Sequence, residues 1–168
     1  MVVCVSSHHA SPVPVDTAFK LPEGSSERAC SSQGGLRVLI VDDNHIYLNI
    51  VSRMLKKYFT HVVKYTHATS SPLSALEALS LHLYDLILLD IDMPVLTGIE
   101  ATQEIRNPYS KFHVLESNRR IPIIAVTTND LEEHRRHYTE VGMNACVGKP
   151  VSLDELRRAL NAVIGLTD

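Results

Sequence analysis

Short apolar runs alternate with stretches of helical periodicity along most of this 168-residue chain, and this alternation constrains the fold more than any other feature. A short continuous apolar run is typical of a buried strand, whereas apolar residues at three- and four-residue spacing indicate a helix. We expect strands at residues 38–41, 61–66, 86–89, 121–126 and 144–148. We expect helices at residues 47–58, 72–83, 98–106, 131–141 and 153–164. The alternation predicts an α/β protein with an open, doubly wound sheet of parallel strands.

The first 35 residues lack this alternation. They contain seven Ser, three Pro and three Gly, and neither the helical nor the strand period runs through them. Such a composition buries too little apolar surface to offset the entropy of ordering the chain. We therefore expect a disordered segment at residues 1–35, followed by one domain at residues 36–168.

The charge, hydropathy and cysteine content exclude several classes of function. Sixteen Lys and Arg stand against nineteen Asp and Glu, and no basic cluster is longer than two residues, so we expect no direct nucleic-acid binding. No apolar run approaches the roughly 18 residues that span a bilayer, and the short apolar start Met1-Val2-Val3-Cys4-Val5 does not resemble a secretion leader. We therefore expect a soluble, cytoplasmic protein with no membrane partner. The scattered Cys4, Cys30 and Cys146 suit neither disulfides nor zinc, and we expect free thiols.

Polar residues follow the expected strands at the points where the strands end. They are Asp42, Asp43, Asp90, Thr127, Thr128 and Lys149. In open parallel sheets, ligands bind at the carboxyl ends of the strands, where the strand order reverses. If the strand order is 2-1-3-4-5, the first and third strands are neighbours and the three carboxylates converge. One edge of the sheet therefore carries the candidate chemistry.

Three converging carboxylates repel one another and cannot all stay ionised without a cation. A hard divalent ion such as Mg²⁺ suits them, because it prefers oxygen ligands. With an open coordination position, the ion can hold a phosphoryl oxygen while a carboxylate attacks phosphorus. We assign the attack to Asp90, which lies between the acidic pair and the positions of Thr127 and Lys149. If strand alternation persists, Asp92 offers the ion its backbone carbonyl.

Five groups of residues also occur in a characteristic order along the chain. They are Val41-Asp42-Asp43-Asn44, Asp90-Ile91-Asp92-Met93-Pro94 with Gly98, Thr127, Gly142-Met143-Asn144, and Lys149-Pro150. Together they resemble the receiver domains of response regulators in two-component phosphorelays, over residues 36–165. The resemblance implies a flavodoxin-like (βα)5 sheet with strand order 2-1-3-4-5. It also implies that the protein is a phosphoacceptor rather than an enzyme.

The resemblance implies a role for each acidic residue that matches the family pattern. Asp90 would accept a phosphoryl group from a phosphohistidine. Asp43 would bind Mg²⁺ directly, and Asp42 would act through a water molecule. The backbone carbonyl of Asp92 would complete the metal site.

The resemblance extends to the other side of the site and to partners. Thr127 and Lys149 would contact the phosphoryl group, and the Lys149-Pro150 bond would be cis, an isomer accessible mainly before proline. The implied partners are a histidine-containing phosphotransfer protein or a histidine kinase upstream and an effector protein downstream. We expect the phosphotransfer partner to approach past three exposed residues of the first helix, His45, Leu48 and Ser52.

Two positions depart from the family pattern. Receivers usually carry Tyr or Phe three residues before the lysine, where this chain has Cys146, and many relay receivers carry Asn where this chain has Tyr47. The expected switch residues are thus Thr127 and Cys146, of which Cys146 is too small to fill the space of an aromatic ring. We expect Thr127 to move on phosphorylation and output to use the loop after the fourth strand or the fourth helix. The segment 107–120 resembles eukaryotic, especially fungal, receivers, for which a nuclear location also fits.

Two other functions stay open on the residues alone. Asp90-Ile91-Asp92 fits the nucleophile and acid/base pair of a haloacid dehalogenase-type hydrolase, although that family carries the motif on its first strand. A receiver fold could also serve as a docking module that works without phosphorylation. Thr128 would replace Thr127 as the phosphoryl contact if the strand register slips by one residue. The chain leaves no room for a separate effector domain, so we expect output through a partner unless the chain belongs to a longer protein.

Overall fold

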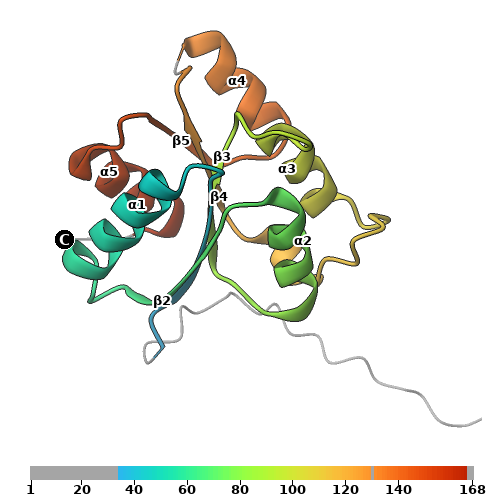
Figure 1. Ribbon diagram of the computed structural model, residues 1–168, viewed down its shortest axis with the longest axis horizontal. Helices are drawn as coiled ribbons and strands as arrows, with labels where there is room; N and C mark the ends of the chain where they lie inside the picture. The colour runs from blue at the N-terminus through green and yellow to red at the C-terminus, as the bar shows by residue number, and fades with distance from the viewer. Residues whose placement is uncertain (1–33, 130, 166–168) are drawn as a thin grey trace, which may run out of the picture. The chain divides into compact units, whose positions relative to one another are not determined.

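The computed structural model describes residues 34–129 and 131–165, so residues 1–33 of the segment expected to be disordered lie outside the described residues. Five parallel strands form one sheet in the order β2-β1-β3-β4-β5, which confirms the predicted fold class (Figure 1). The strands are β1 (Leu36–Val41), β2 (Val63–Thr69), β3 (Leu86–Asp90), β4 (Ile123–Thr127) and β5 (Ala145–Gly148).

A helix follows each strand. The helices are α1 (His45–Tyr58), α2 (Pro72–Leu81), α3 (Gly98–Arg106), α4 (Glu132–Glu140) and α5 (Leu153–Ile164), with a short 3-10 helix η1 (Asn118–Arg120). Among the helices described, none combines the length and the apolarity that crossing a membrane requires.

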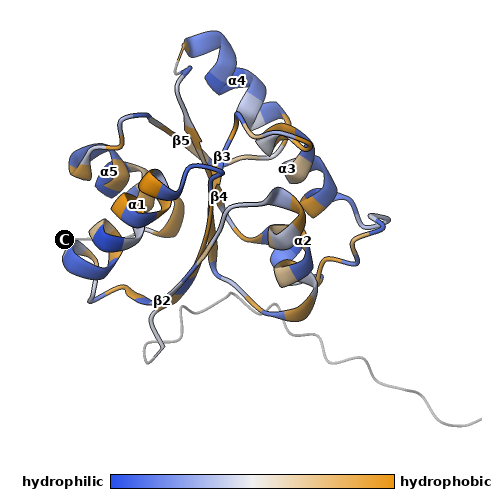
Figure 2. Ribbon diagram, in the orientation of Figure 1, coloured by the Kyte–Doolittle hydropathy of each residue, from blue (hydrophilic) through white to orange (hydrophobic). Residues whose placement is uncertain are grey.

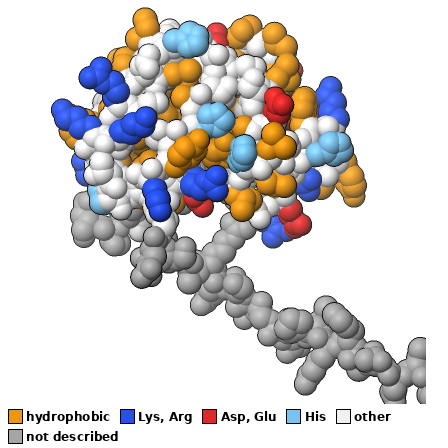
Figure 3. Space-filling model, turned by 60° about the horizontal axis from the view of Figure 1, so that its bottom comes forward, with side chains coloured by type: hydrophobic (Ala, Val, Ile, Leu, Met, Phe, Trp, Pro, Cys, Tyr) orange, Lys and Arg blue, Asp and Glu red, His pale blue; other side chains and the backbone are white. Residues whose placement is uncertain are grey.

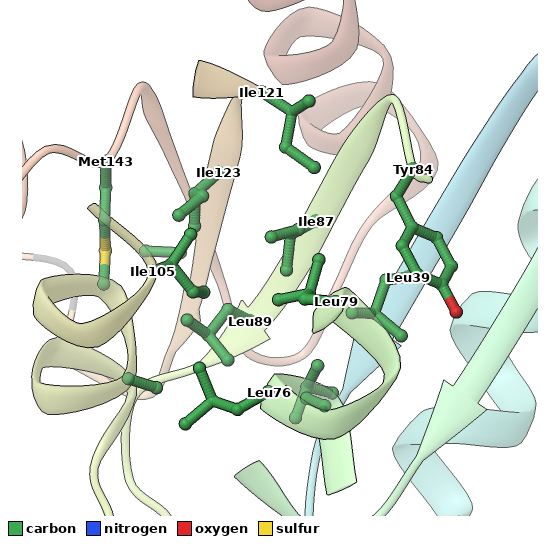
Figure 4. Packing of buried hydrophobic residues seen from close by; sticks show 14 of the residues in the cluster. Leu39, Leu76, Leu79, Tyr84, Ile87, Leu89, Ile105, Ile121, Ile123 and Met143 are labelled. Atoms are coloured by element: carbon green, nitrogen blue, oxygen red, sulfur yellow. The ribbon is translucent and has the colours of Figure 1, made fainter. Parts of the chain in front are cut away.

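The helices cover both faces of the sheet, α1 and α5 on one face and α2, α3 and α4 on the other (Figure 1). Successive residues of a strand point to opposite faces, so Val38 and Ile40 join the buried cluster with α1 and α5, whereas Leu39 joins the cluster with α2 and α3. Figure 4 shows the second cluster, in which strand residues pack against Leu76 and Leu79 of α2. Figure 2 shows hydrophobic colour along the strands and hydrophilic colour over most of α4.

Local capping contacts fix where two site-flanking helices begin. The Asn44 side chain accepts a hydrogen bond from the Ile46 N–H (2.9 Å) and starts α1. Thr97 and Glu100 form a reciprocal capping box, and α3 begins at Gly98. Because α1 follows β1 and α3 follows β3, the two caps close the loops that carry the candidate site.

Two predicted strands are displaced in the structure. We expected a strand at 61–66, but β2 begins at Val63, because the chain is still turning there and the Val63 N–H donates to the Phe59 carbonyl (2.7 Å). We expected the fourth strand to begin at residue 121, but β4 begins at Ile123. Pro122 has no N–H to donate to a neighbouring strand, so the central strand starts after it.

The predicted exposure of Leu48 on α1 is wrong. Leu48 is only 6% exposed and packs with Val51 and Leu55 in the cluster between α1 and the sheet. Residues spaced by three and four positions share one helix face, and this face is turned toward β1 and β3. The exposed apolar residues near the start of α1 are instead Ile46 and Ile50, at 68% and 44%.

The long segment at residues 107–120 is anchored by a buried polar side chain. Asn118 is fully buried, and its amide donates to the carbonyl oxygens of Leu79 (2.8 Å) and His82 (2.7 Å). Its side-chain oxygen accepts from the Tyr84 N–H (3.0 Å). These bonds tie the segment to the end of α2, and no apolar period in the sequence signals them.

Candidate functional site

Three aspartate side chains converge at the carboxyl edge of the sheet, between β1 and β3. Asp42 and Asp43 follow β1, and Asp90 is the last residue of β3. One carboxylate oxygen from each lies within 4.8 Å of the other two. Asp42 and Asp90 are buried, whereas Asp43 is exposed.

The face turned forward in Figure 3 has no comparable acidic cluster in view among the described residues. It shows basic, histidine and hydrophobic side chains interspersed, with acidic side chains scattered.

The ammonium group of Lys149 lies among these carboxylates. Lys149 follows β5, and its Nζ is 2.8 Å from Asp42 Oδ2 and 2.9 Å from Asp90 Oδ1. The Nζ also lies 4.6 Å from the centroid of the Tyr47 ring, within the range of a cation–π contact. The lysine is therefore held by two carboxylates and an aromatic ring that come from three different segments of the chain.

The electrostatics of the cluster favour a divalent cation. Burial raises the pKa of Asp90, an effect that the hydrogen bond from Lys149 opposes and the charge of Asp42 reinforces. Burial acts to lower the pKa of Lys149, but the hydrogen bonds to Asp42 and Asp90 and their charges outweigh it and raise that pKa. With three carboxylates and one ammonium ionised, the cluster carries two net negative charges, which one divalent cation would balance.

Backbone groups orient the two buried carboxylates. The Asn44 N–H donates to Asp42 Oδ1 (2.8 Å), and the Asp92 N–H donates to Asp90 Oδ1 (3.4 Å). Gly98 allows the start of α3 to approach this loop, because a Cβ there would collide with the carbonyl oxygen of Asp90. The position of the Asp90 loop thus depends on a residue without a side chain at 98.

Asp92 lies outside the carboxylate cluster. Its side chain is exposed and accepts a hydrogen bond from Thr128 Oγ1 (3.2 Å). At the end of β5, the Lys149–Pro150 peptide bond is cis, and the Lys149 N–H donates to the Thr127 carbonyl (2.7 Å). Thr128, which directly follows β4, therefore reaches the Asp92 loop through its side chain, and Thr127, the last residue of β4, reaches Lys149 through its backbone carbonyl.

The side chain of Thr127 is fully buried and faces helix α4. Its Oγ1 accepts from the Asn129 N–H (3.0 Å) and lies 3.3 Å from the Tyr138 hydroxyl. Cys146 is a half-buried thiol on β5. Sequence reasoning missed Tyr138, which is the one buried residue of α4. The available signal was an aromatic ring in an otherwise polar helix.

These features define an α/β protein with a lysine-bridged acidic site at the carboxyl edge of its sheet. Residues 38–161 match the model of the response regulator receiver domain family. The chain belongs to this family and is a receiver domain of two-component signalling. The family match decides against the haloacid dehalogenase-type alternative.

Two relatives show how the same domain occurs within longer proteins. The chain is 32% identical over 146 residues to the sensor histidine kinase RcsC of Escherichia coli (strain K12), across 86% of this chain and 14% of RcsC. It is 34% identical over 126 residues to the transcription factor SKN7 of Saccharomyces cerevisiae, across 75% of this chain and 18% of SKN7. The chain thus corresponds to less than a fifth of the length of these relatives.

Solved structures include similar receivers. One is the receiver domain of sensor histidine kinase PA1611 from Pseudomonas aeruginosa PAO1, which has a magnesium ion coordinated in its active site cleft. It is 33% identical, with a TM-score of 0.65, and the match covers 79% of this chain and 100% of that chain. The chemotaxis protein CheY4 of Vibrio cholerae is 25% identical, with a TM-score of 0.65, over 77% of this chain and 99% of that chain.

Proposed function

We propose that this chain takes up a phosphoryl group from a phosphohistidine onto Asp90 and signals through the resulting conformational change. The observation that carries the proposal is the position of Asp90, which is buried with one oxygen 2.9 Å from the Lys149 ammonium and with Asp42 and Asp43 alongside. A carboxylate nucleophile needs its charge balanced but its lone pair available, and a cation on one oxygen leaves the other to attack. Receiver domains are phosphoacceptors rather than classical enzymes.

The donor set fits Mg²⁺ as the cofactor. Asp43 is exposed and offers a carboxylate, Asp42 and Asp90 supply the neighbouring charge, and the Asp92 carbonyl is a further oxygen donor on the same loop. The site presents oxygen ligands without His or Cys, which suits a hard cation. When bound, Mg²⁺ would neutralise charge on the transferred phosphoryl group.

The chemistry that the protein itself supplies is alignment and charge. An oxygen of Asp90 attacks phosphorus, the P–N bond of the phosphohistidine breaks, and the imidazole leaves with the electron pair. The Lys149 ammonium, now shared between Asp42 and Asp90, is placed to neutralise one phosphoryl oxygen. The Thr127 hydroxyl would contact another after turning from α4.

The phosphohistidine donor is a protein, and α1 offers the surface for it. Ile46 and Ile50 lie exposed on the helix that starts directly after the acidic pair. Apolar residues beside the site would let a helical phosphotransfer protein bury surface while its histidine approaches Asp90. These two residues replace Leu48, which is buried.

The test is labelling with phosphoramidate or acetyl phosphate and Mg²⁺, followed by measurement of the intact mass. We expect one phosphoryl group on the wild type, none on Asp90→Asn, and wild-type labelling on Asp154→Asn, an identical change at an exposed position of α5. Labelling that persists in Asp90→Asn would show that another residue is the acceptor. No labelling of the wild type would favour a docking module that works without phosphorylation.

A further inference from the structure

The one buried side chain of α4 is hydrogen-bonded to the residue expected to sense the phosphoryl group. Tyr138 is 4% exposed, and its hydroxyl lies 3.3 Å from Thr127 Oγ1 and donates to the Asn129 carbonyl (3.3 Å). The Asn129 N–H in turn donates to Thr127 Oγ1 (3.0 Å). Thr127, the loop after β4 and α4 therefore form one connected hydrogen-bond network.

A cavity borders the tyrosine. It has a volume of about 200 Å³. Its lining residues are Arg135, Tyr138, Thr139, Met143, Ala145 and Cys146. A larger side chain on β5 at position 146 would project into this space, so the small thiol is what leaves it open. The Tyr138 ring consequently borders both Thr127 and a space into which it can move.

We propose that Tyr138 on α4 is the switch residue, in place of an aromatic residue on β5. It would couple Thr127 to the α4–β5 face, by which we mean the residues of α4 and β5 that line this cavity. When Thr127 Oγ1 turns toward a phosphoryl oxygen, its hydrogen bond to the Tyr138 hydroxyl is lost. The ring is then released toward the cavity beside Cys146, and α4 moves with it because Tyr138 is the only buried residue of α4. This inference rests on the proposed phosphorylation of Asp90.

The proposed coupling between Tyr138 and the phosphorylation site predicts the direction in which a variant changes the affinity for a phosphoryl mimic. The Thr127–Tyr138 hydrogen bond exists only while Thr127 faces α4, so it stabilises the unphosphorylated state. By linkage, removing the Tyr138 hydroxyl must favour the phosphorylated state. We expect Tyr138→Phe to tighten the binding of beryllofluoride with Mg²⁺, a mimic of the phosphoryl group, about fivefold, which is the factor for one neutral hydrogen bond.

The same variant separates coupling from a packing role. In full-length protein we expect beryllofluoride to change amide exchange in the Asp90 loop and in α4 of the wild type. Tyr138→Phe should keep the change in the Asp90 loop and lose most of the change in α4. Tyr109→Phe makes the same change at an exposed tyrosine and should behave as wild type. Adding Cys146→Tyr to Tyr138→Phe should move the response from α4 to β5.

Each outcome bears on a different claim. If beryllofluoride leaves the Asp90 loop of the wild type unchanged, the proposed function fails and takes this inference with it. If the loop responds but Tyr138→Phe binds beryllofluoride no more tightly and keeps the α4 response, only the inference fails. The ring resonances of Tyr138 in the wild type provide a measurement that needs no variant, because they should shift on adding beryllofluoride. Unchanged resonances beside a responding Asp90 loop would also overturn it.

Discussion

The acidic cluster and the α4–β5 face are built in different ways. The cluster consists of residues at the ends of strands or directly after them, so each side chain is placed by its own segment. The α4–β5 face depends on how a helix packs, because Tyr138 reaches Thr127 from 11 residues further along the chain. The comparison teaches that residues at strand ends can form the phosphorylation site with little dependence on distant contacts, whereas transmission of a conformational change from that site depends on tertiary packing.

The largest expected effect is the loss of the lysine that bridges the cluster. Lys149→Met leaves the buried Asp42 and Asp90 without their counter-charge, and removing one partner of a buried ion pair costs about 3–5 kcal/mol. We expect a lower free energy of unfolding of the metal-free protein in urea. Lys57→Met changes an exposed lysine on α1 and should leave the stability within about 0.5 kcal/mol of wild type.

The pH dependence of this stability difference shows whether the charge of Lys149 is its source. Because the folded state raises the pKa of Lys149, the stability that its charge contributes is present below the ordinary lysine pKa. It is lost as the pH rises through the raised pKa. The difference between the wild type and Lys149→Met should therefore shrink at alkaline pH. A difference that stays constant up to strongly alkaline pH would show that the ammonium charge is not its source.

The acidic residues provide the next prediction. Asp43→Ala removes the exposed carboxylate that is proposed to bind Mg²⁺ directly, whereas Asp42→Ala removes a buried one already bonded to Lys149. We expect the Mg²⁺ affinity to fall on the order of 100-fold for Asp43→Ala and about tenfold for Asp42→Ala. Calorimetric titration of both variants measures this. The reverse order would mean that Asp42 is the direct ligand.

The sequence predicted the cluster because its determinants are short. Apolar runs located the ends of β1 and β3, and the strand order brought Asp42 and Asp90 together. The helix after β1 was predicted from residue 47, but Asn44 caps it and α1 begins at His45. The same reasoning could not fix the rotation of α1, and it placed the buried Leu48 outside. The rotation of a helix about its axis is set by all the residues that pack against its neighbours, and the apolar residues of α1 are compatible with more than one rotation.

Two other contacts were beyond sequence reasoning for a related reason. Asn118 is buried and bonded to backbone groups near the end of α2, more than 30 residues earlier in the chain. The Arg106 guanidinium donates to the carbonyl oxygens of Gly142 (2.8 Å) and Arg119 (2.6 Å), and so links α3 to two other segments. Backbone carbonyls are present at every residue, so no sequence pattern marks those that a distant side chain will meet.

The docking surface on α1 provides a smaller effect. Ile46→Arg should weaken phosphotransfer from a phosphohistidine protein by roughly tenfold. Loss of a side chain at the centre of an interface typically costs more than about 1 kcal/mol of binding free energy, and we expect Ile46 to lie at the centre. Leu81→Arg on α2 is a matched control, because Leu81 is exposed to a similar extent, 65% against 68%. Transfer rates measured with both variants decide the question. Equal rates would place the donor elsewhere.

The smallest expected effect tests how tolerant the α4–β5 face is. Cys146 borders the cavity of about 200 Å³ on a strand, so Cys146→Val adds apolar volume where there is room and a β-branched side chain where strands favour one. We expect a gain of about 0.5 kcal/mol in the free energy of unfolding, measured in urea, with unchanged Mg²⁺ affinity. A loss of about 1 kcal/mol or more would mean that the cavity cannot accept a methyl group, and that Tyr138 has no space to enter. In the acidic cluster, by contrast, Asp42, Asp90 and Lys149 are fixed by charge and by hydrogen bonds. This difference in tolerance would allow the switch residue to change while the phosphorylation site does not.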